Sequence, residues 1–459
     1  MAILEALLSS LLILSSAVNG IEFKNITLPC KEDHRDEDGS TFSLAVSFTE
    51  EFCEKDEKLS ECPTLLYAGG EGDLSDFVAN TGFLYKVAEE THSRLVYAEH
   101  RFYGKSMLDV DDDNYSLLDS QQAMADFKQV ADHFNGSKNV VIGGSYGGML
   151  AAWLRVTYPK TFVGALASSA SVLYMWPDEY RMTDLYQIVA NDFFACKEEV
   201  HSAFSDLLNL SKTNQFGAIQ QQLNLCHPLK NQIQSNNTIA LLQQSLTNLA
   251  QLDYPYPTDF LYSLPGNPVD VACEMFAAAG GGIDGLVEAA SLTLGKDDCI
   301  SVNLDHWHAF APGLIDGPWG YQRCTELVMP ASVAPGGVFL SCEEMDQNCF
   351  TSGHESQKEY CAAMYRVEEL FPDETVQQLH GNAVTFNDTG NIIFTYGDLD
   401  IWSGSGVMKA SNEYDNFEVF WIEGGAHHLD LRGDNDADPQ SVRDVREKSM
   451  NIIKKWIKE

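Results

Sequence analysis

The feature that most constrains the fold is a series of short, nearly all-apolar runs separated by helical patterns. Such runs are typical of parallel strands covered on both faces. The predicted strands are 64–68, 94–98, 139–143, 162–166, 391–396 and 417–422. The clearest predicted helices are 118–134, 147–158 and 439–458. Because strands alternate with helices, the sequence predicts an α/β sheet.

The alternating pattern stops near residue 180 and resumes near residue 390. The segment between is rich in Gln, Asn, Leu and Cys and poor in strand signals. We expect a mainly helical insertion there, cross-linked by disulfides. The predicted division is a signal peptide at 1–20, a first part of the α/β domain at 21–180, the inserted domain at 181–380 and the second part of the α/β domain at 381–459.

The N-terminus is typical of a cleaved signal peptide. An apolar run covers residues 6–18, and Val18 and Gly20 are small enough to precede a cleavage site. Glu5 is atypical, since a Lys or Arg is expected there. No later segment reaches 18 apolar residues, so we expect no membrane insertion.

Two further features favour the secretory pathway, with a secreted or a lysosomal destination. Six glycosylation sequons are present, at Asn25, Asn114, Asn135, Asn209, Asn236 and Asn387. The chain also has 11 cysteines and no CxxC pair, which makes zinc unlikely and disulfides expected in an oxidising compartment. Because the count is odd, at least one cysteine is free or pairs with another chain.

The charge limits the partners. Only 29 Lys and Arg face 67 Asp and Glu, giving a formal net charge of −38. This argues against nucleic acid and against anionic membrane surfaces. It suits a protein that stays folded in acid, or simply a soluble surface. We expect no metal and no cofactor.

The segment 140–148 carries the strongest chemical signal. It places Gly143-x-Ser145-x-Gly147 directly after a predicted strand and before a predicted helix, the setting that a nucleophile elbow requires. A turn this sharp strains the backbone and exposes the serine hydroxyl, and glycines avoid clashes with the crossing strand and helix. The motif alone also occurs by chance. In this setting it predicts that Ser145 is a nucleophile.

A nucleophilic serine needs a base and an orienting acid, in the order Ser, Asp, His for this kind of turn. The two strands predicted after the insertion are followed by Asp398-Leu-Asp400 and by His427-His428. Both loops follow the C-terminal ends of strands, where α/β sites form. Spacing alone leaves either Asp as the acid and either His as the base.

An oxyanion hole is expected beside the nucleophile. One donor should be the backbone N–H of Tyr146, the residue after the serine. The other should come from the Gly-rich loop after the strand at 64–68, where Gly70 and Glu71 are the candidate backbone donors. The alternative for this loop is an ordinary turn.

Longer stretches resemble the serine carboxypeptidase family that includes lysosomal Pro-X carboxypeptidase, dipeptidyl peptidase II and thymus-specific serine protease. The similar stretches are 69–73 (GGEGD), 80–83 (NTGF), 97–104 (YAEHRFYG), 143–153 (GGSYGGMLAAW), 253–256 (DYPY), 319–326 (WGYQRCTE) and 425–432 (GAHHLDLR). They run in order from about residue 64 towards the C-terminus. The resemblance implies an α/β-hydrolase fold with a helical cap inserted before the catalytic Asp.

The resemblance also implies the roles of the site residues. The family acid, in an Asn-Gly-x-Leu-Asp-Pro-Trp motif, falls on Asp400, and the base, the first His of Gly-Ala-His-His, falls on His427. The implied reaction is acyl transfer through Ser145. The chain departs from the acid motif at two positions, because Ile401 replaces the Pro and Tyr396 replaces the Asn.

Several residues are candidates for substrate binding. Glu71 could bind a substrate amine, or pair with Arg101. Aromatic residues could form a pocket for a proline ring, or simply pack in the core. These aromatic candidates are Phe102, Tyr103, Tyr146, Trp402, Trp319 and Tyr321.

The first hypothesis for function is a serine-type exopeptidase that hydrolyses short peptides after proline or a small residue. The family contains dipeptidyl aminopeptidases and Pro-X carboxypeptidases, and the DYPY stretch slightly favours the former. One alternative is a secreted esterase or lipase, which predicts a more apolar insertion. Another is a catalytically silent binding protein on the same scaffold, against which the intact serine, acid and base argue. A homodimer is kept as an option.

Overall fold

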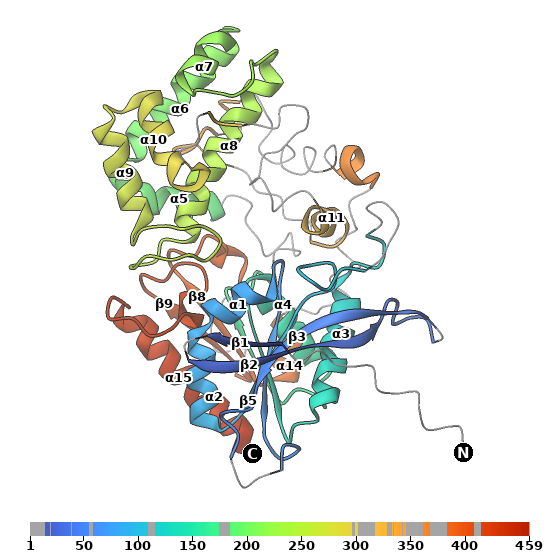
Figure 1. Cartoon of the computed structure of the whole chain (residues 1–459). Coiled ribbons are helices and arrows are strands. Elements are labelled where there is room, and N and C mark those ends of the chain that lie inside the picture. The colour runs from blue at the N-terminus through green and yellow to red at the C-terminus, as the bar shows by residue number, and fades with distance from the viewer. Residues whose placement is uncertain are drawn as a thin grey trace.

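The structure is a computed structural model of the whole chain (Figure 1). It describes residues 14–18, 20–37, 39–54, 58–108, 115–173, 184–295, 299–301, 317–327, 333, 335–341, 343–345, 358, 361–367, 383–407 and 415–458.

The described residues contain a nine-stranded sheet in the order β1-β2-β3-β5-β4-β6-β7-β8-β9. Its strands are β1 (Leu14–Val18), β2 (Ile21–Lys31), β3 (Thr41–Thr49), β4 (Thr64–Ala68), β5 (Arg94–Ala98), β6 (Asn139–Gly144), β7 (Gly164–Ser168), β8 (Ile392–Gly397) and β9 (Phe417–Ile422). β1, β2, β3 and β5 pair antiparallel in turn, and β5, β4 and β6–β9 pair parallel. This order, with β4 and β5 exchanged, is that of an α/β-hydrolase.

The six predicted strands are present, and β4, β5 and β9 have the predicted bounds. β7 begins two residues later than predicted, at Gly164. The N-terminal strands were not predicted, and β1 lies within the segment 1–20 that was predicted to be a signal peptide. In β2, buried and exposed residues alternate over most of its length, so it has no continuous apolar run.

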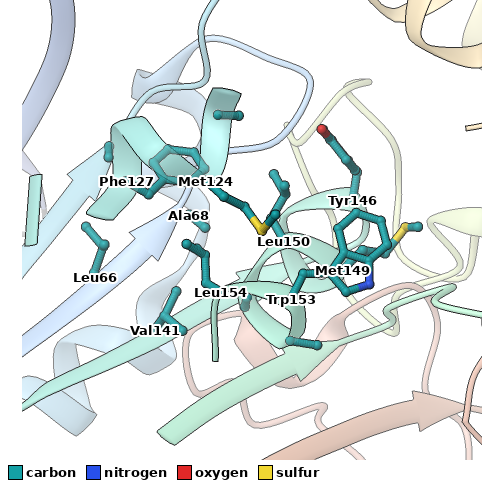
Figure 2. Packing of buried hydrophobic residues seen from close by; sticks show 14 of the residues in the cluster. Leu66, Ala68, Met124, Phe127, Val141, Tyr146, Met149, Leu150, Trp153 and Leu154 are labelled. Carbon is teal, nitrogen blue, oxygen red and sulfur yellow. The ribbon is translucent and has the colours of Figure 1, made fainter. Parts of the chain in front are cut away.

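Helices cover both faces of the sheet. α3 (Ser120–Phe134), α4 (Tyr146–Thr157) and α14 (Ala383–Thr389) lie on one face, and α1 (Leu74–Asn80), α2 (Gly82–Thr91) and α15 (Gln440–Lys458) on the other. The run of β4 is apolar because both of its faces are covered. Leu66 and Ala68 face α3 and α4, and Leu65 and Tyr67 face the helices on the other side. Figure 2 shows the first of these cores, with Phe127 and Trp153 packed near β4 and β6.

A mainly helical layer, here called the cap, comes between β7 and β8 in the sequence and lies above the sheet in Figure 1. Its helices are α5 (Asp184–Asp192), α6 (Lys197–Lys212), α7 (Phe216–Gln222), α8 (Gln232–Gln251), α9 (Pro268–Ala278), α10 (Gly282–Leu294) and α11 (Pro318–Thr325). The cap core continues into the loops after β8 and β9 through Ile401 and Ala426. The predicted boundaries at 180 and 380 lie outside the described residues.

Four disulfides join described cysteines, namely Cys53–Cys62, Cys196–Cys273, Cys226–Cys299 and Cys324–Cys361. Cys30 is buried and free. Cys342 and Cys349 lie outside the described residues. Three of the four bonds link cap segments, as expected for a cross-linked insertion, and disulfides fit an oxidising compartment.

The sequons differ in accessibility. Asn135 and Asn209 are exposed, and Asn25, Asn236 and Asn387 are partly exposed. Asn114 lies outside the described residues. Within the described ranges, no helix has the length and apolar character needed to cross a membrane.

Candidate active site

Ser145 lies on a strained turn between β6 and α4, with φ 57° and ψ −128°. The turn leaves no room for side chains on its glycines. A Cβ on Gly143 would lie 2.0 Å from the Gly147 carbonyl oxygen, and one on Gly147 would lie 2.6 Å from the Ala68 oxygen. The Ser145 N–H donates to the Ser168 carbonyl at 2.9 Å, which ties the turn to β7. The sheet backbone therefore holds the serine in the predicted geometry.

The two segments predicted to form the oxyanion hole are neighbours. A Cβ on Gly70 would lie 3.3 Å from the Gly147 nitrogen, so the loop after β4 packs against the start of α4. Tyr146 is the first residue of α4, where a backbone N–H has no acceptor within the helix. The loop that carries Gly70 and Glu71 therefore lies beside the start of α4, next to Ser145.

The structure distinguishes the two candidate acids. His427 Nδ1 and Asp400 Oδ1 are 2.7 Å apart, and both side chains are buried. The Trp402 N–H donates to the same carboxylate oxygen at 3.1 Å. Asp398 instead accepts from the Gly424 N–H at 2.6 Å and makes a turn. Of the two acids, Asp400 is the one paired with a histidine.

The structure also distinguishes the two histidines. The Arg432 guanidinium donates to the ring Nδ1 of His428 at 2.6 Å, and the backbone N–H of His428 donates to Ser169 Oγ at 2.7 Å. Burial, then the nearby His427 and Arg432, lower the pKa of His428 well below its ordinary value. His428 is therefore held neutral, with no carboxylate partner among the described residues.

His427 Nε2 is buried and has no hydrogen-bond partner in the described part of the chain. Ser145 is partly exposed at the end of its turn. No hydrogen bond joins the two side chains among the described residues, and such contacts are often long before substrate binds. His427 can therefore act as a base, because Asp400 orients its ring through Nδ1 and Nε2 has no partner among the described residues.

Two of the predicted pocket aromatics flank this site. The Trp402 ring centroid lies 6.4 Å from that of His427, and the Trp319 centroid lies 5.5 Å from that of Tyr146. Tyr103 is buried, and its hydroxyl donates to Gln322 Oε1 at 2.6 Å. Both tryptophans are partly buried and retain accessible surface.

Phe102 does not fit the predicted pocket role. It is 1% exposed and packs on Tyr115 with ring centroids 5.7 Å apart. A side chain this buried offers no surface to a substrate, so Phe102 is a core residue. Tyr321 similarly packs on Tyr115 and on Tyr365.

The predicted alternative of a Glu71–Arg101 pair is wrong. Arg101 is fully buried and binds Asp126, with Nε 2.7 Å from Oδ2, and it donates to backbone carbonyls as well. Glu71 forms no ion pair within the described residues. Burial of its carboxyl raises the pKa of Glu71, and the nearby His427 opposes that shift.

Sequence analysis did not identify the residues that hold the base. The His427 N–H donates to the Gln251 carbonyl at the end of α8 at 3.2 Å, and the Tyr254 hydroxyl donates to the His427 carbonyl at 2.8 Å. Tyr254 belongs to the DYPY stretch, which was the available signal. No group of three or more His, Cys, Asp or Glu side chains that could hold a metal ion occurs in the described ranges.

The fold and this site define a serine hydrolase of the α/β class. The chain belongs to the serine carboxypeptidase S28 family, whose model matches residues 33–449. It is therefore a serine-type peptidase.

The relatives agree over most of the chain. Lysosomal Pro-X carboxypeptidase of Bos taurus is 33% identical over 419 residues, covering 86% of this chain and 80% of the relative. Thymus-specific serine protease of Homo sapiens is 25% identical over 433 residues, covering 86% and 80%. Among solved structures, proline iminopeptidase of Mycobacterium smegmatis aligns with a TM-score of 0.42 and 13% identity, covering 94% of this chain and 98% of the other.

Proposed function

We propose that this chain is an exopeptidase of the secretory pathway, secreted or lysosomal, that cleaves short peptides after proline. Ser145 is the nucleophile, His427 the base and Asp400 the orienting acid. The observation that carries the proposal is the buried His427–Asp400 pair, in the loops after β8 and β9. The histidine loop lies against the strained serine turn, because a Cβ on Gly144 would lie 3.1 Å from the His428 ring.

The chemistry follows from this arrangement. As Ser145 Oγ attacks the peptide carbonyl carbon, His427 Nε2 takes its proton, and Asp400 stabilises the charged imidazole. The backbone N–H groups of Tyr146 and of the Gly70–Glu71 loop stabilise the oxyanion. His427 then protonates the leaving amine, and water hydrolyses the acyl-enzyme.

For the direction of cleavage we propose a Pro-X carboxypeptidase. Support comes from relatives of that name that are 33% identical over 86% of the chain. The relatives give no support to the slight preference for a dipeptidyl aminopeptidase drawn from the DYPY stretch, and Tyr254 in that stretch binds the His427 backbone.

One observation keeps the dipeptidyl aminopeptidase as a second candidate. Glu71 is a carboxylate beside the site with no basic partner among the described residues, and a substrate amine would satisfy it. The two partly buried tryptophans, Trp402 and Trp319, offer apolar surface to a proline ring in either case. The Gln- and Asn-rich cap does not favour a lipid substrate.

Paired peptide assays at pH 5 and pH 7 test the proposal, with Ser145→Ala as the control. One substrate is an N-blocked peptide ending in Pro-Phe, and the other is a free-amine X-Pro dipeptide with a C-terminal chromophore. We expect cleavage of the first. Cleavage of the second alone would establish the aminopeptidase direction. If neither is cut faster than by Ser145→Ala, the peptidase proposal fails, and ester hydrolysis or simple binding becomes the alternative.

A further inference from the structure

The stretch 319–326 covers most of α11 in the cap, and the proposed reaction uses only its Trp319, as surface for the substrate. Gln322 of this helix is fully buried, and its two amide atoms contact two tyrosines of the hydrolase domain. Tyr103 Oη donates to Gln322 Oε1 at 2.6 Å, and Gln322 Nε2 donates to Tyr146 Oη at 2.9 Å. The first contact joins residues that are 219 positions apart in the chain, and the second joins residues that are 176 positions apart.

The hydrogen bonds of this cluster have a defined direction. His100 Nδ1 lies 2.7 Å from the Arg101 carbonyl, which can only accept, so the Nδ1 of His100 carries the proton. His100 Nε2 therefore accepts from the Tyr146 hydroxyl at 3.1 Å. The Tyr146 hydroxyl in turn accepts from Gln322, so both of its roles are filled.

The far end of the cluster fixes α11 itself. Gln322 Nε2 also lies 3.3 Å from Glu326 Oε1. Glu326 accepts from the Ser120 N–H at 2.7 Å and from Ser120 Oγ at 2.7 Å, at the start of α3. The Trp319 ring packs on Tyr146. The Tyr146 side chain is therefore held by α11 from two sides.

We propose that Gln322 is a positioning residue that sets the backbone of Tyr146 and so completes the oxyanion hole. This rests on the proposed function, in which the Tyr146 N–H stabilises the oxyanion. The Tyr146 side chain is 2% exposed and fully bonded, so its position and that of its own N–H are linked. Because the Gln322 side chain is fully buried, it cannot contact a substrate directly. We therefore expect the position of α11 to affect kcat and not the affinity for substrate.

Two variants test this, Gln322→Met, which keeps the volume, and Tyr146→Phe, which keeps the ring beneath Trp319. We expect each to lower kcat about 10-fold while KM changes less than about two-fold, as for loss of a well-aligned hydrogen bond. The double variant should be no worse than the more affected single variant. Gln234→Met is the matched control, since Gln234 is also a buried cap glutamine, bonded to the Lys230 N–H, and should leave kcat unchanged.

The second readout is the rate at which a fluorophosphonate modifies Ser145, which forms the Oγ–P bond, expels fluoride and passes the proton to His427. It requires no peptidase activity, so it separates this inference from the proposed function. We expect both variants to slow labelling by the same factor as kcat. Unchanged labelling, or a change in KM alone, would overturn the role of Gln322. If Gln322→Met does not fold, Tyr146→Phe decides by the same criteria.

Discussion

The nucleophile and the base of the candidate site are held by different parts of the molecule. Ser145 is fixed by the sheet, through its N–H bond to Ser168 on β7 and the close packing of Gly143 and Gly147. The His427 loop is bonded to the cap as well, through the Gln251 carbonyl and the Tyr254 hydroxyl, in addition to the bond from the His428 N–H to Ser169 next to β7. The comparison teaches that the nucleophile geometry depends on contacts within the α/β fold, whereas alignment of the base also depends on a seated cap.

The largest expected effect is on the sheet side. Replacing Ser145 with Ala removes the nucleophile and should lower kcat by about 10⁵-fold or more. The turn itself is held by backbone contacts, so the melting temperature should change little. Peptide hydrolysis and thermal unfolding of the same preparation check both statements. Residual activity within 100-fold of the unmodified chain would contradict the assignment.

The next effect is on the acid. Asp400→Asn should lower kcat by about 10³- to 10⁴-fold, because the amide favours the wrong imidazole tautomer. Asp398→Asn is the matched control two residues away. Asp398 caps the turn at Gly424 and has no histidine partner in the described residues, so activity should stay within about two-fold. Equal losses in the two variants would contradict the choice of acid.

A smaller effect is expected on the cap side. Tyr254→Phe removes the hydrogen bond to the His427 carbonyl and should lower kcat about 5- to 10-fold, as for one net hydrogen bond. Tyr262→Phe is the control, since its hydroxyl accepts from Asn248 within the cap. Steady-state kinetics on both variants measure the difference. If Tyr262→Phe costs as much as Tyr254→Phe, the effect is on the cap as a whole and not on the base.

The smallest effect concerns cap stability and pH. Burial, then the charge of neighbouring carboxylates, raises the pKa of Asp192 and of Asp253, which lie side by side near Asp270 and Asp398. Because the folded-state values exceed the ordinary 3.8, the folded chain holds these protons more tightly. Their contribution to stability is complete below pH 3.8 and is lost as the pH rises through the raised values.

Asp192→Asn should therefore raise the melting temperature at pH 8 by about 2 °C and leave it nearly unchanged at pH 3.5, below the ordinary value of 3.8. Differential scanning calorimetry at the two pH values measures this. An equal shift at both, or a loss at pH 8, would show that repulsion between these carboxylates does not act on the cap.

The same division explains what the sequence could predict. β4 and β5 were predicted to the residue because a strand covered on both faces is apolar over nearly its whole length, as Leu65 and Leu66 illustrate. β9 was also predicted to the residue, although it is a partly exposed edge strand that contains Glu418. The serine turn followed from its own local glycines. Choosing Asp400 and His427 over Asp398 and His428 needed the family resemblance, and the structure pairs the same two residues.

The rest depended on contacts between distant residues. Phe102 was assigned to a pocket because aromatic character does not distinguish a core residue from a pocket residue. An ion pair between Glu71 and Arg101 was predicted as one alternative, but Arg101 binds Asp126 on α3. Gln322 and Tyr254 have no local signal for what they contact, since their partners lie on segments brought together only by folding.

The measurement that tests the central claim most directly is peptide mapping after fluorophosphonate labelling of the unmodified chain, Asp400→Asn and Asp398→Asn. We predict one label per chain on Ser145, slowed at least 100-fold in Asp400→Asn and unchanged in Asp398→Asn. A label on another residue, or equal rates in the three proteins, would contradict a serine nucleophile activated by the His427–Asp400 pair.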